Sequence, residues 1–424
     1  MENIKKEAYE LMEISNEVIK LACECEQELQ EKFNEIEEVA LFNTAKVLNA
    51  FKMSRISDSH FKATTGYGYD DMGRDAIEKV YSDIFKTEDA LVRINFVNGT
   101  HSLSTAISGN LMPNDLLVSI TGAPYDTLAE TIGIVENSMS LMAMGIKYKQ
   151  VELKNGTFDI EAIVDVVKNN KVKMIFIGRS RGYAVRPSQT IDQIANVIAK
   201  IKEIDPNVIV MVDNCYGEFV ENKEPTEVGA DIMAGSLIKN LGGGLCETGG
   251  YIVGKKELVE NAAKRLTAPG IGKECGATLG KNKEILQGLF MAPQAVKNAL
   301  KTAVLASAMI EKLGYETSPT PWEYRTDIIQ SVIFNDEKKL ISFIQGIQAA
   351  SPVDSFVVPE PWAMPGYTNP VIMAAGTFVS GASIELSCDA PVKEPYAVFM
   401  QGGLTYESAK LGICTAIDKM IRGK

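Results

Sequence analysis

The sequence predicts an α/β protein with a mostly parallel sheet, helices on both faces of that sheet, and a smaller second domain. From about Arg74 to Val296, short runs rich in valine and isoleucine alternate with helical patterns, which is typical of a parallel sheet covered on both faces. The chain has 424 residues. Because a single core stops growing at about 250–300 residues, at least two domains are expected.

Residues 1–73 are expected to form a helical arm that includes an inter-subunit segment. Between Lys5 and about Phe51 the apolar residues recur at helical spacing, and no strand pattern interrupts them. A helical arm of this kind often packs on another domain or on another subunit.

Residues 74–295 are expected to form the large α/β domain. Its strand candidates include "DALVRINFV", "NDLLVSITG", "VKMIFIG" and "PNVIVMVDN", and helical patterns separate them. In open α/β sheets, ligands bind at the carboxyl ends of the strands. The residues that directly follow these runs are therefore the candidates for a functional site.

Residues 296–424 are expected to form a smaller α+β domain. A long helical stretch after Met291, "APQAVKNALKTAVLASAMIEKLG", connects it to the large domain. Beyond this connector, "TDIIQSVIFN" and "PVIMAAGTFVSGASIELS" have strand character, and "TYESAKLGICTAIDKMI" has helical periodicity.

The composition excludes several classes of partner. The formal net charge of -12 argues against nucleic acid and against anionic membranes, because both select for basic surfaces. No run approaches the ~18 apolar residues of a membrane span. His60 and His101 are the only histidines, so no zinc cluster of ordinary spacing can form and we expect no metal. We interpret the scattered cysteines as reduced and the protein as cytoplasmic.

The segment "GSLIKNLGGG", residues 235–244, places Lys239 just after an apolar run, and a buried lysine is costly unless it is paired or neutralised. Ser236 stands three positions earlier, and Asp213 ends the preceding apolar run. Alone, Asp213 reads as a turn or cap residue. Together the three suit pyridoxal phosphate: the lysine forms a Schiff base, the aspartate keeps the ring nitrogen protonated, and the serine reaches the phosphate. We expect the glycines to let the backbone pass close to the cofactor.

Two further strand ends add to this pattern. In "NGTHS", Gly99, Thr100 and His101 would open a helix, whose amino terminus favours a phosphate, although an ordinary N-cap has the same sequence. In "TGAPYDTL", Tyr125 follows the next strand. Its ring could stack on a pyridine ring, and packing against the core is an equally good explanation.

The chain resembles the pyridoxal-phosphate enzymes of fold type I, and within them the methionine gamma-lyase-like family that is also labelled aluminium resistance protein. The resemblance runs through most of the chain. It is carried by "TTGYGYDDMGRDAIEKVY", "DALVRINFVNGTHSL", "GAPYDTL", "IGRSRGYAVRPSQTI", "VDNCYGEFVE", "GSLIKNLGGGLCETGGYIVG", "RLTAPGIG" and "QGGLTYE". It implies an aspartate aminotransferase-like fold with a seven-stranded, mostly parallel sheet, and a carbon–sulfur lyase acting on a sulfur amino acid.

The resemblance also implies roles for individual residues. Lys239 is the Schiff-base lysine, Asp213 the pyridinium partner and Tyr125 the ring-stacking residue, with Gly99, Thr100, His101 and Ser236 around the phosphate. In the related cystathionine enzymes, a tyrosine and an arginine ahead of the phosphate loop reach into the neighbouring subunit's site. Tyr67, Tyr69 and Arg74 occupy that region here, which implies a homodimer or homotetramer with shared sites. A flexible turn capped by aspartates is the alternative for this segment.

The sequence departs from the cystathionine enzymes at the substrate carboxylate. Those enzymes use an arginine of the small domain, whereas the matching stretch here, "FMQGGLTYE", has none, and "DAPVKEPY" has Lys393 where the family suggests arginine. "RSRGY" provides Arg179 and Arg181 at a strand end of the large domain. Since an arginine fork suits a carboxylate, we expect Arg181 to bind the substrate; a charged loop is the alternative.

Three functions are compatible with these motifs. The first is the lyase just described, in which a thiol leaves the beta or gamma carbon of methionine, cystathionine or cysteine. The second is a serine acyl-enzyme, because "SLIK" is also an S-x-x-K motif, but the S-D-N and K-T-G strings that accompany it elsewhere are missing. The third is a cofactor-binding protein with another amino-acid reaction or with a non-catalytic role in metal tolerance.

Overall fold

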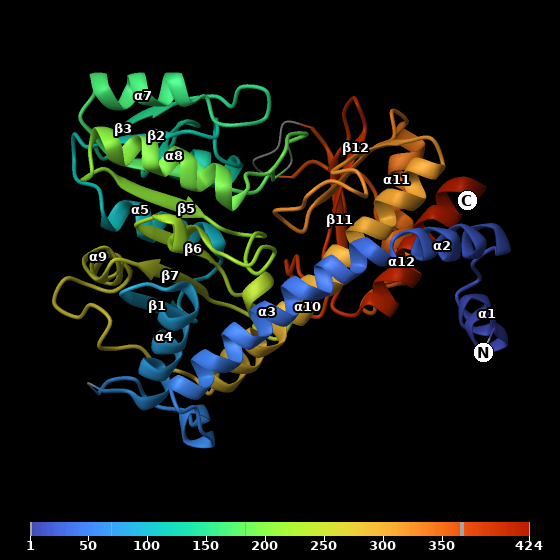
Figure 1. Ribbon diagram of the computed structural model, residues 1–424, viewed down its shortest axis with the longest axis horizontal. Coiled ribbons are helices and arrows are strands. Elements are labelled where there is room, and N and C mark those ends of the chain that lie inside the picture. The colour runs from blue at the N-terminus through green and yellow to red at the C-terminus, as the bar shows by residue number, and fades with distance from the viewer. Residues whose placement is uncertain (1, 69, 183, 365–368, 424) are drawn as a thin grey trace.

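The computed structural model describes residues 2–68, 70–182, 184–364 and 369–423. Two α/β halves lie side by side, and two long helices run together from one half to the other (Figure 1). These helices are α3 (Gln30–Met53) and α10 (Asn282–Lys312). Each half contains one sheet. Because ligands of open α/β sheets bind at the carboxyl ends of the strands, the candidate site is expected at that edge of the larger sheet.

The larger sheet has seven strands in the order β1-β7-β6-β5-β4-β2-β3. Neighbouring strands from β3 to β6 are parallel, and β7 runs antiparallel to both β1 and β6. The prediction of a mostly parallel seven-stranded sheet is confirmed. The strands are β1 (Asp89–Arg93), β2 (Leu116–Ser119), β3 (Lys147–Gln150), β4 (Val172–Gly178), β5 (Ile209–Asp213), β6 (Ile232–Ser236) and β7 (Gly250–Gly254).

Residue type explains this order. Every residue of β5, β6 and β7 is buried, as expected for central strands with helices on both faces. The edge strand β3 reads "KYKQ", and its lysines are exposed, which protects the edge from pairing with other chains. The helices that cover this sheet are α4 (Met72–Phe85), α5 (Gly99–Gly109), α6 (Asp126–Ile132), α7 (Ile160–Asn169), α8 (Ile191–Ile204) and α9 (Lys256–Leu266).

The smaller sheet is fully antiparallel, in the order β10-β11-β12-β9-β8. Its helices α11 and α12 pack on one face, and that face belongs to the main core. Its elements are β8 (Glu316–Ser318), β9 (Gln330–Ile333), α11 (Glu337–Ala349), β10 (Val371–Ala374), β11 (Ser387–Pro391), β12 (Ala397–Gln401) and α12 (Tyr406–Arg422).

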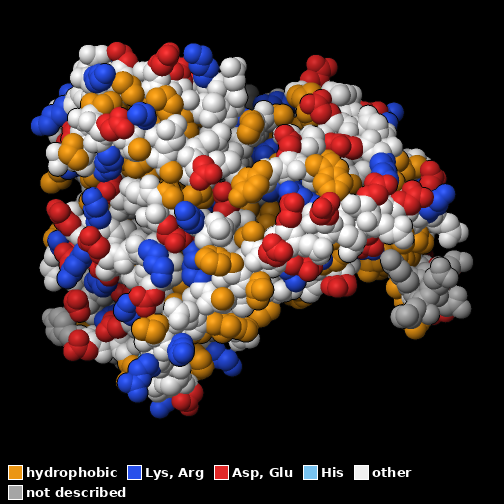
Figure 2. All heavy atoms as spheres, viewed as in Figure 1, with side chains coloured by type: hydrophobic (Ala, Val, Ile, Leu, Met, Phe, Trp, Pro, Cys, Tyr) orange, Lys and Arg blue, Asp and Glu red, His pale blue; other side chains and the backbone are white. Residues whose placement is uncertain are grey.

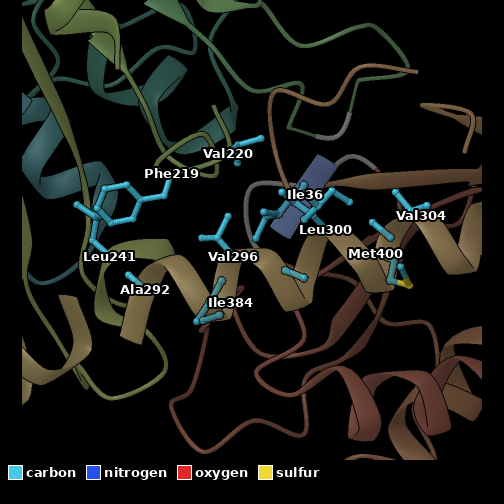
Figure 3. Packing of buried hydrophobic residues seen from close by; sticks show 14 of the residues in the cluster. Ile36, Phe219, Val220, Leu241, Ala292, Val296, Leu300, Val304, Ile384 and Met400 are labelled. Carbon is cyan, nitrogen blue, oxygen red and sulfur yellow. The ribbon is translucent and has the colours of Figure 1, made fainter. Parts of the chain in front are cut away.

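The amino-terminal arm is helical, as the apolar spacing predicts. It consists of α1 (Glu2–Leu11), α2 (Asn16–Glu28) and α3, and α3 packs along α10. Figure 3 shows α10 as the common core element: Leu241 and Phe219 of the larger half and Ile384 and Met400 of the smaller half lie along it. The expected domain limit at residues 295 and 296 falls inside this continuous helix, and the domain division stays a prediction.

The surface and the cysteines fit an ordinary globular chain. On the face seen in Figure 2, acidic and basic side chains are interspersed. All seven cysteines are free thiols. Within the described ranges there is no helix with the length and hydropathy to cross a bilayer. Nor do the residues described here bring three or more histidine, cysteine, aspartate or glutamate side chains together as a metal site.

Candidate active site

The candidate site lies where β5 and β6 end side by side. Asp213 is the last residue of β5 and pairs with Ala234 of β6. Lys239 follows the end of β6 at Ser236 by three residues. Because parallel strands carry their carboxyl ends at the same edge, the two residues that the sequence connects only by order share one edge of the sheet.

The amine of Lys239 points at an aromatic ring. Its Nζ lies 3.9 Å from the ring centroid of Tyr216. Burial by itself would lower the pKa of the ammonium, but Cys215, Tyr216, Asp213 and Tyr125 together raise the pKa of Lys239 well above its ordinary value. In the described part of the chain no carboxylate lies within ion-pair distance of this amine. Lys239 is thus a half-buried residue whose amine lies in a cluster of polar groups at the sheet edge.

Asp213 belongs to the same cluster of polar groups, since it and Lys239 act on each other electrostatically. Its Oδ1 accepts a hydrogen bond of 3.0 Å from the amide of Cys215. Burial raises the pKa of the Asp213 carboxyl, and Lys239 and the bond from Cys215 offset only part of that rise. A buried carboxylate without a formal counter-ion is costly, so this group suits a partner that brings a proton, such as a protonated ring nitrogen.

The amino terminus of α5 lies beside β6, the strand that leads to Lys239. Asn98 caps the helix by accepting a 2.9 Å bond from the amide of His101, which leaves the first helical amides, at Gly99 and Thr100, directed outward. Ser102 ties the helix to β6, since its hydroxyl donates to the carbonyls of Gly99 and Gly235. The expected phosphate residues are therefore adjacent to the strand that leads to Lys239.

Gly99 and Ser236 face one another in this corner. A Cβ placed on Gly99 would lie 3.4 Å from the Cβ of Ser236 and 3.5 Å from Sγ of Cys215. The Ser236 hydroxyl accepts a 3.2 Å bond from the amide of Ile238 and is buried. Outward amides at a helix amino terminus beside a hydroxyl form the kind of donor set that binds a phosphate.

The hydroxyl groups of Tyr125 and Thr100 are in contact. Their hydroxyl oxygens are 2.9 Å apart, and Thr100 also lies 3.0 Å from the hydroxyl of Thr127. Burial and the nearby Asp213 carboxyl raise the pKa of Tyr125 above its ordinary value. The expected ring-stacking residue is thus fixed beside the phosphate corner and within electrostatic range of Asp213 and Lys239.

These residues fit pyridoxal phosphate as a donor set. An amine, a carboxyl group in need of a proton, an aromatic ring and helix amides converge from the ends of four strands, β6, β5, β2 and β1. Lys239 would hold the aldehyde carbon, Asp213 the ring nitrogen, and the Gly99, Thr100 and Ser236 corner the phosphate. When bound, the cofactor supplies an electron-accepting ring for the carbon next to the amino group.

The glycines after Lys239 have a structural reason that differs from the expected one. A Cβ on Gly243 would lie 2.4 Å from the carbonyl oxygen of Gly288 in α10, and one on Gly244 would lie 2.4 Å from Leu404. The backbone of this turn therefore packs directly against α10 and the small domain. This contact is a packing reason for Gly243 and Gly244, and the expectation that the glycines let the backbone pass close to the cofactor stays a prediction.

Arg179 is enclosed by polar groups of its own chain. Its guanidinium is fully buried, and it donates to Oδ1 of Asn214 at 2.7 Å, to the carbonyl of Gly217 at 2.9 Å and to Glu221 at 2.5 Å. A second carboxylate, Glu224, lies 3.8 Å away. These contacts connect Arg179 to the loop that follows Asp213 and occupy its Nη1 and Nη2, whereas its buried Nε has no hydrogen-bond partner among the described residues.

Arg181 lies at the boundary between the two halves. Its Nη1 donates to the carbonyl and the hydroxyl of Ser318 at 2.8 and 3.0 Å, and its Nε lies 3.4 Å from Ser188 and 3.8 Å from Asp327. The side chain is thus at the end of β4, where the sequence expects it, and in contact with β8 of the small domain.

The segment expected to cross to a neighbouring subunit is held by its own chain at the base. Arg74 is buried in α4, where its amide bonds to Asp71 and its Nη1 donates to the carbonyl of Gly66 at 3.3 Å. Tyr67 is 83% exposed, so its ring is available to another subunit. Tyr69 lies outside the described residues. The shared site stays a prediction.

Three residues that interact with Lys239 were not expected from the sequence: Tyr216, Cys215 and Glu218. All follow Asp213 in "DNCYGE". Glu218 is fully buried, its Oε1 accepts a 2.7 Å bond from the hydroxyl of Tyr251, and burial raises its pKa to about 8. An aromatic residue within three positions of the strand-end aspartate was the available signal for Tyr216.

The sheet order, the antiparallel carboxyl-terminal sheet and a half-buried lysine just after β6 define the fold type I class of pyridoxal-phosphate enzymes. Within that class, the chain belongs to the methionine gamma-lyase family, which matches residues 18–421.

Several relatives support this assignment. A crystal structure from Clostridium acetobutylicum, described provisionally as a cystathionine beta-lyase involved in aluminium resistance, is 51% identical, has a TM-score of 0.95 and covers 99% of each chain. One from Clostridium novyi NT, described as a carbon–sulfur lyase involved in aluminum resistance, is 48% identical with a TM-score of 0.94, covering 97% of this chain and 98% of that one. The uncharacterized protein YnbB of Bacillus subtilis is 50% identical over 95% of this chain and 96% of its own length.

Proposed function

We propose that this protein is a pyridoxal-phosphate-dependent carbon–sulfur lyase that eliminates a thiol from a sulfur amino acid of the methionine, cystathionine or cysteine class. The single observation that carries the proposal is the convergence of the Lys239 amine and the Asp213 carboxyl at adjacent strand ends, beside the amino terminus of α5. The names of the two clostridial relatives support the same reaction class.

The chain's own residues would divide the chemistry as follows. The Lys239 amine, once free, takes the proton from the alpha carbon of the amino acid and holds it as an ammonium. Asp213 would hold the proton-bearing ring nitrogen of the cofactor, and its buried surroundings would exclude water from that contact. For loss from the beta carbon, the C–S electron pair leaves with the sulfur, which takes up a proton, and the pair from the alpha C–H bond forms the new double bond. Loss from the gamma carbon requires that a proton also be taken from the beta carbon. In both cases water then replaces the amino group, which gives the 2-oxo acid and ammonia.

We further propose different roles for Arg181 and Arg179. Arg181 is proposed to bind the substrate carboxylate, because it contacts the small domain at Ser318, where the two halves of the chain meet. Arg179 is proposed to position the loop after Asp213, because three groups of that loop already receive its hydrogen bonds. Tyr67 and Arg74 are proposed to meet a neighbouring subunit's site in a homodimer or homotetramer.

Borohydride reduction of the protein with added pyridoxal phosphate, followed by peptide mapping, tests the anchor. We expect a single pyridoxyl label on Lys239 and none in the Lys239→Ala variant. Incubation with methionine, cystathionine and cysteine should release a thiol and a 2-oxo acid. A label on another lysine would overturn the site, whereas a Lys239 label without thiol release would favour another amino-acid reaction or a non-catalytic role.

A further inference from the structure

Tyr216 adopts a backbone conformation that needs support. Its φ is +72°, in the left-handed region that non-glycine residues rarely adopt and that is found mostly where the surroundings impose it. This conformation turns the ring of Tyr216 toward Lys239, whose Nζ lies 3.9 Å from the ring centroid. The strained residue is thus the one in contact with the proposed reacting amine.

The large domain holds this loop on both sides of Tyr216. Nη1 of Arg179 donates to Oδ1 of Asn214 and to the carbonyl of Gly217. A Cβ on Gly217 would lie 2.5 Å from Nη1 of Arg179, so glycine is required at this position for the arginine to approach. Asn214 also donates to Glu224 at 2.8 Å. The backbone around Tyr216 is therefore fixed by buried hydrogen bonds.

The small domain holds Tyr216 from the other side. Its carbonyl accepts a 3.2 Å bond from the amide of Ile328. Its side chain packs against the cluster on the inner face of the small sheet, which comprises Ile329, Ile333, Ala397 and Phe399. Tyr216 thus spans the distance from the lysine to the second domain.

Several charged and titratable groups surround Lys239, and the ring of Tyr216 is in direct contact with its amine. The groups that act on it electrostatically are Asp213, Cys215, Tyr216 and Tyr125, and Lys239 acts in turn on Glu218. Among the described residues, the ring of Tyr216 is the cation–π partner of this amine. The face of an aromatic ring stabilises an ammonium more than a neutral amine, because the ring quadrupole is negative at its face.

We infer that Tyr216 is a further catalytic residue, whose ring face holds Lys239 in its ammonium form whenever the lysine is not bound to the cofactor. The catalytic meaning rests on the proposed function: an ammonium formed when Lys239 takes the substrate proton would be stabilised at this ring. The contact itself belongs to the chain alone, so it is measurable without cofactor or substrate.

The test is the pKa of the Lys239 amine in the cofactor-free protein. Competitive acetylation with acetic anhydride across a pH series, read by peptide mass spectrometry, reports the amine's pKa directly. Tyr216→Leu removes the ring, and it should lower this pKa by about one unit. Tyr216→Phe keeps the ring face and should stay near the wild-type value. Both variants place a residue with a Cβ at this position of positive φ, so the two are compared against the same backbone requirement.

Tyr148→Leu provides the control, because Tyr148 lies in β3 and packs against a different core cluster. It should leave the pKa of Lys239 unchanged. If Tyr216→Leu does not fold, Tyr216→Met offers the same comparison with a flexible chain. An unchanged pKa in the aliphatic variant, or an equal fall in Tyr216→Phe, would overturn the inference. Since no cofactor is present, these outcomes are independent of whether thiol release is found.

Discussion

Replacing Arg179 by methionine tests the proposed role of that arginine. The substitution keeps a long side chain but removes the cation that, among the described residues, lies within 4 Å of Glu221 and Glu224, at 2.5 and 3.8 Å. Breaking a buried pair in this way costs about 3–5 kcal/mol, because a charge stays behind without compensation. Asn214 and Gly217 also lose a donor, at about 1 kcal/mol or more each. We expect a total loss of at least about 5 kcal/mol.

Urea denaturation followed by far-ultraviolet circular dichroism measures this loss. The midpoint should fall while the slope stays constant, which identifies a change in stability and not in compactness. The double variant Arg179→Met/Glu221→Gln should recover part of the loss, since it removes the uncompensated carboxylate. A loss below about 1 kcal/mol, the value of an exposed ion pair, would refute the reasoning.

Three further predictions concern the candidate active site. Asp213→Asn should bind pyridoxal phosphate more weakly and lose most turnover, because an amide cannot keep the ring nitrogen protonated; cofactor titration and initial rates measure both, and near-wild-type turnover would contradict the role. Hybrids of Lys239→Ala and Arg74→Ala subunits should regain part of the activity, because one site then lacks both defects; verified hybrids without recovery would place the segment in its own subunit's site. Glu218 has a folded-state pKa raised by burial to about 8, so its protonated form stabilises the protein at low pH. This stability is lost as pH rises from the ordinary carboxyl value near 4.3 through about 8, and urea midpoints of Glu218→Gln should show a smaller decline than wild type across that window.

The sequence predicted the fold and the ends of its strands because those features are local. Runs such as "VIVMVDN" and "DIMAGS" show by composition that they are buried, and β5 and β6 are buried at every position. Asp213 and Lys239 follow these runs directly, so placing the strands also places the two side chains at one edge. The helix cap at Asn98 is likewise a local signal and is present.

The sequence could not separate the two arginines of "RSRGY", because their difference is not local. Both follow β4, and both suit a carboxylate by chemistry alone. Arg179 is distinguished by Glu221, which lies 42 positions later in the chain, and Arg181 by Ser318, which is 137 positions later. Only the folded chain shows that one arginine is enclosed by the loop after Asp213 and that the other contacts the small domain.

The glycines after Lys239 connect the proposed chemistry to the relation between the two domains. Gly243 has a φ of +54°, and a Cβ there would lie 2.4 Å from the carbonyl of Gly288 in α10. A contact between two backbones has no side chain that can change rotamer to absorb a shift. Because α10 continues from this contact into the core of the small domain, a movement of that domain along the helix has either to break the contact or to displace the turn that carries Lys239. Tyr216 links the same lysine to the small sheet through Ile328. The position of the small domain is therefore coupled to the lysine from two sides.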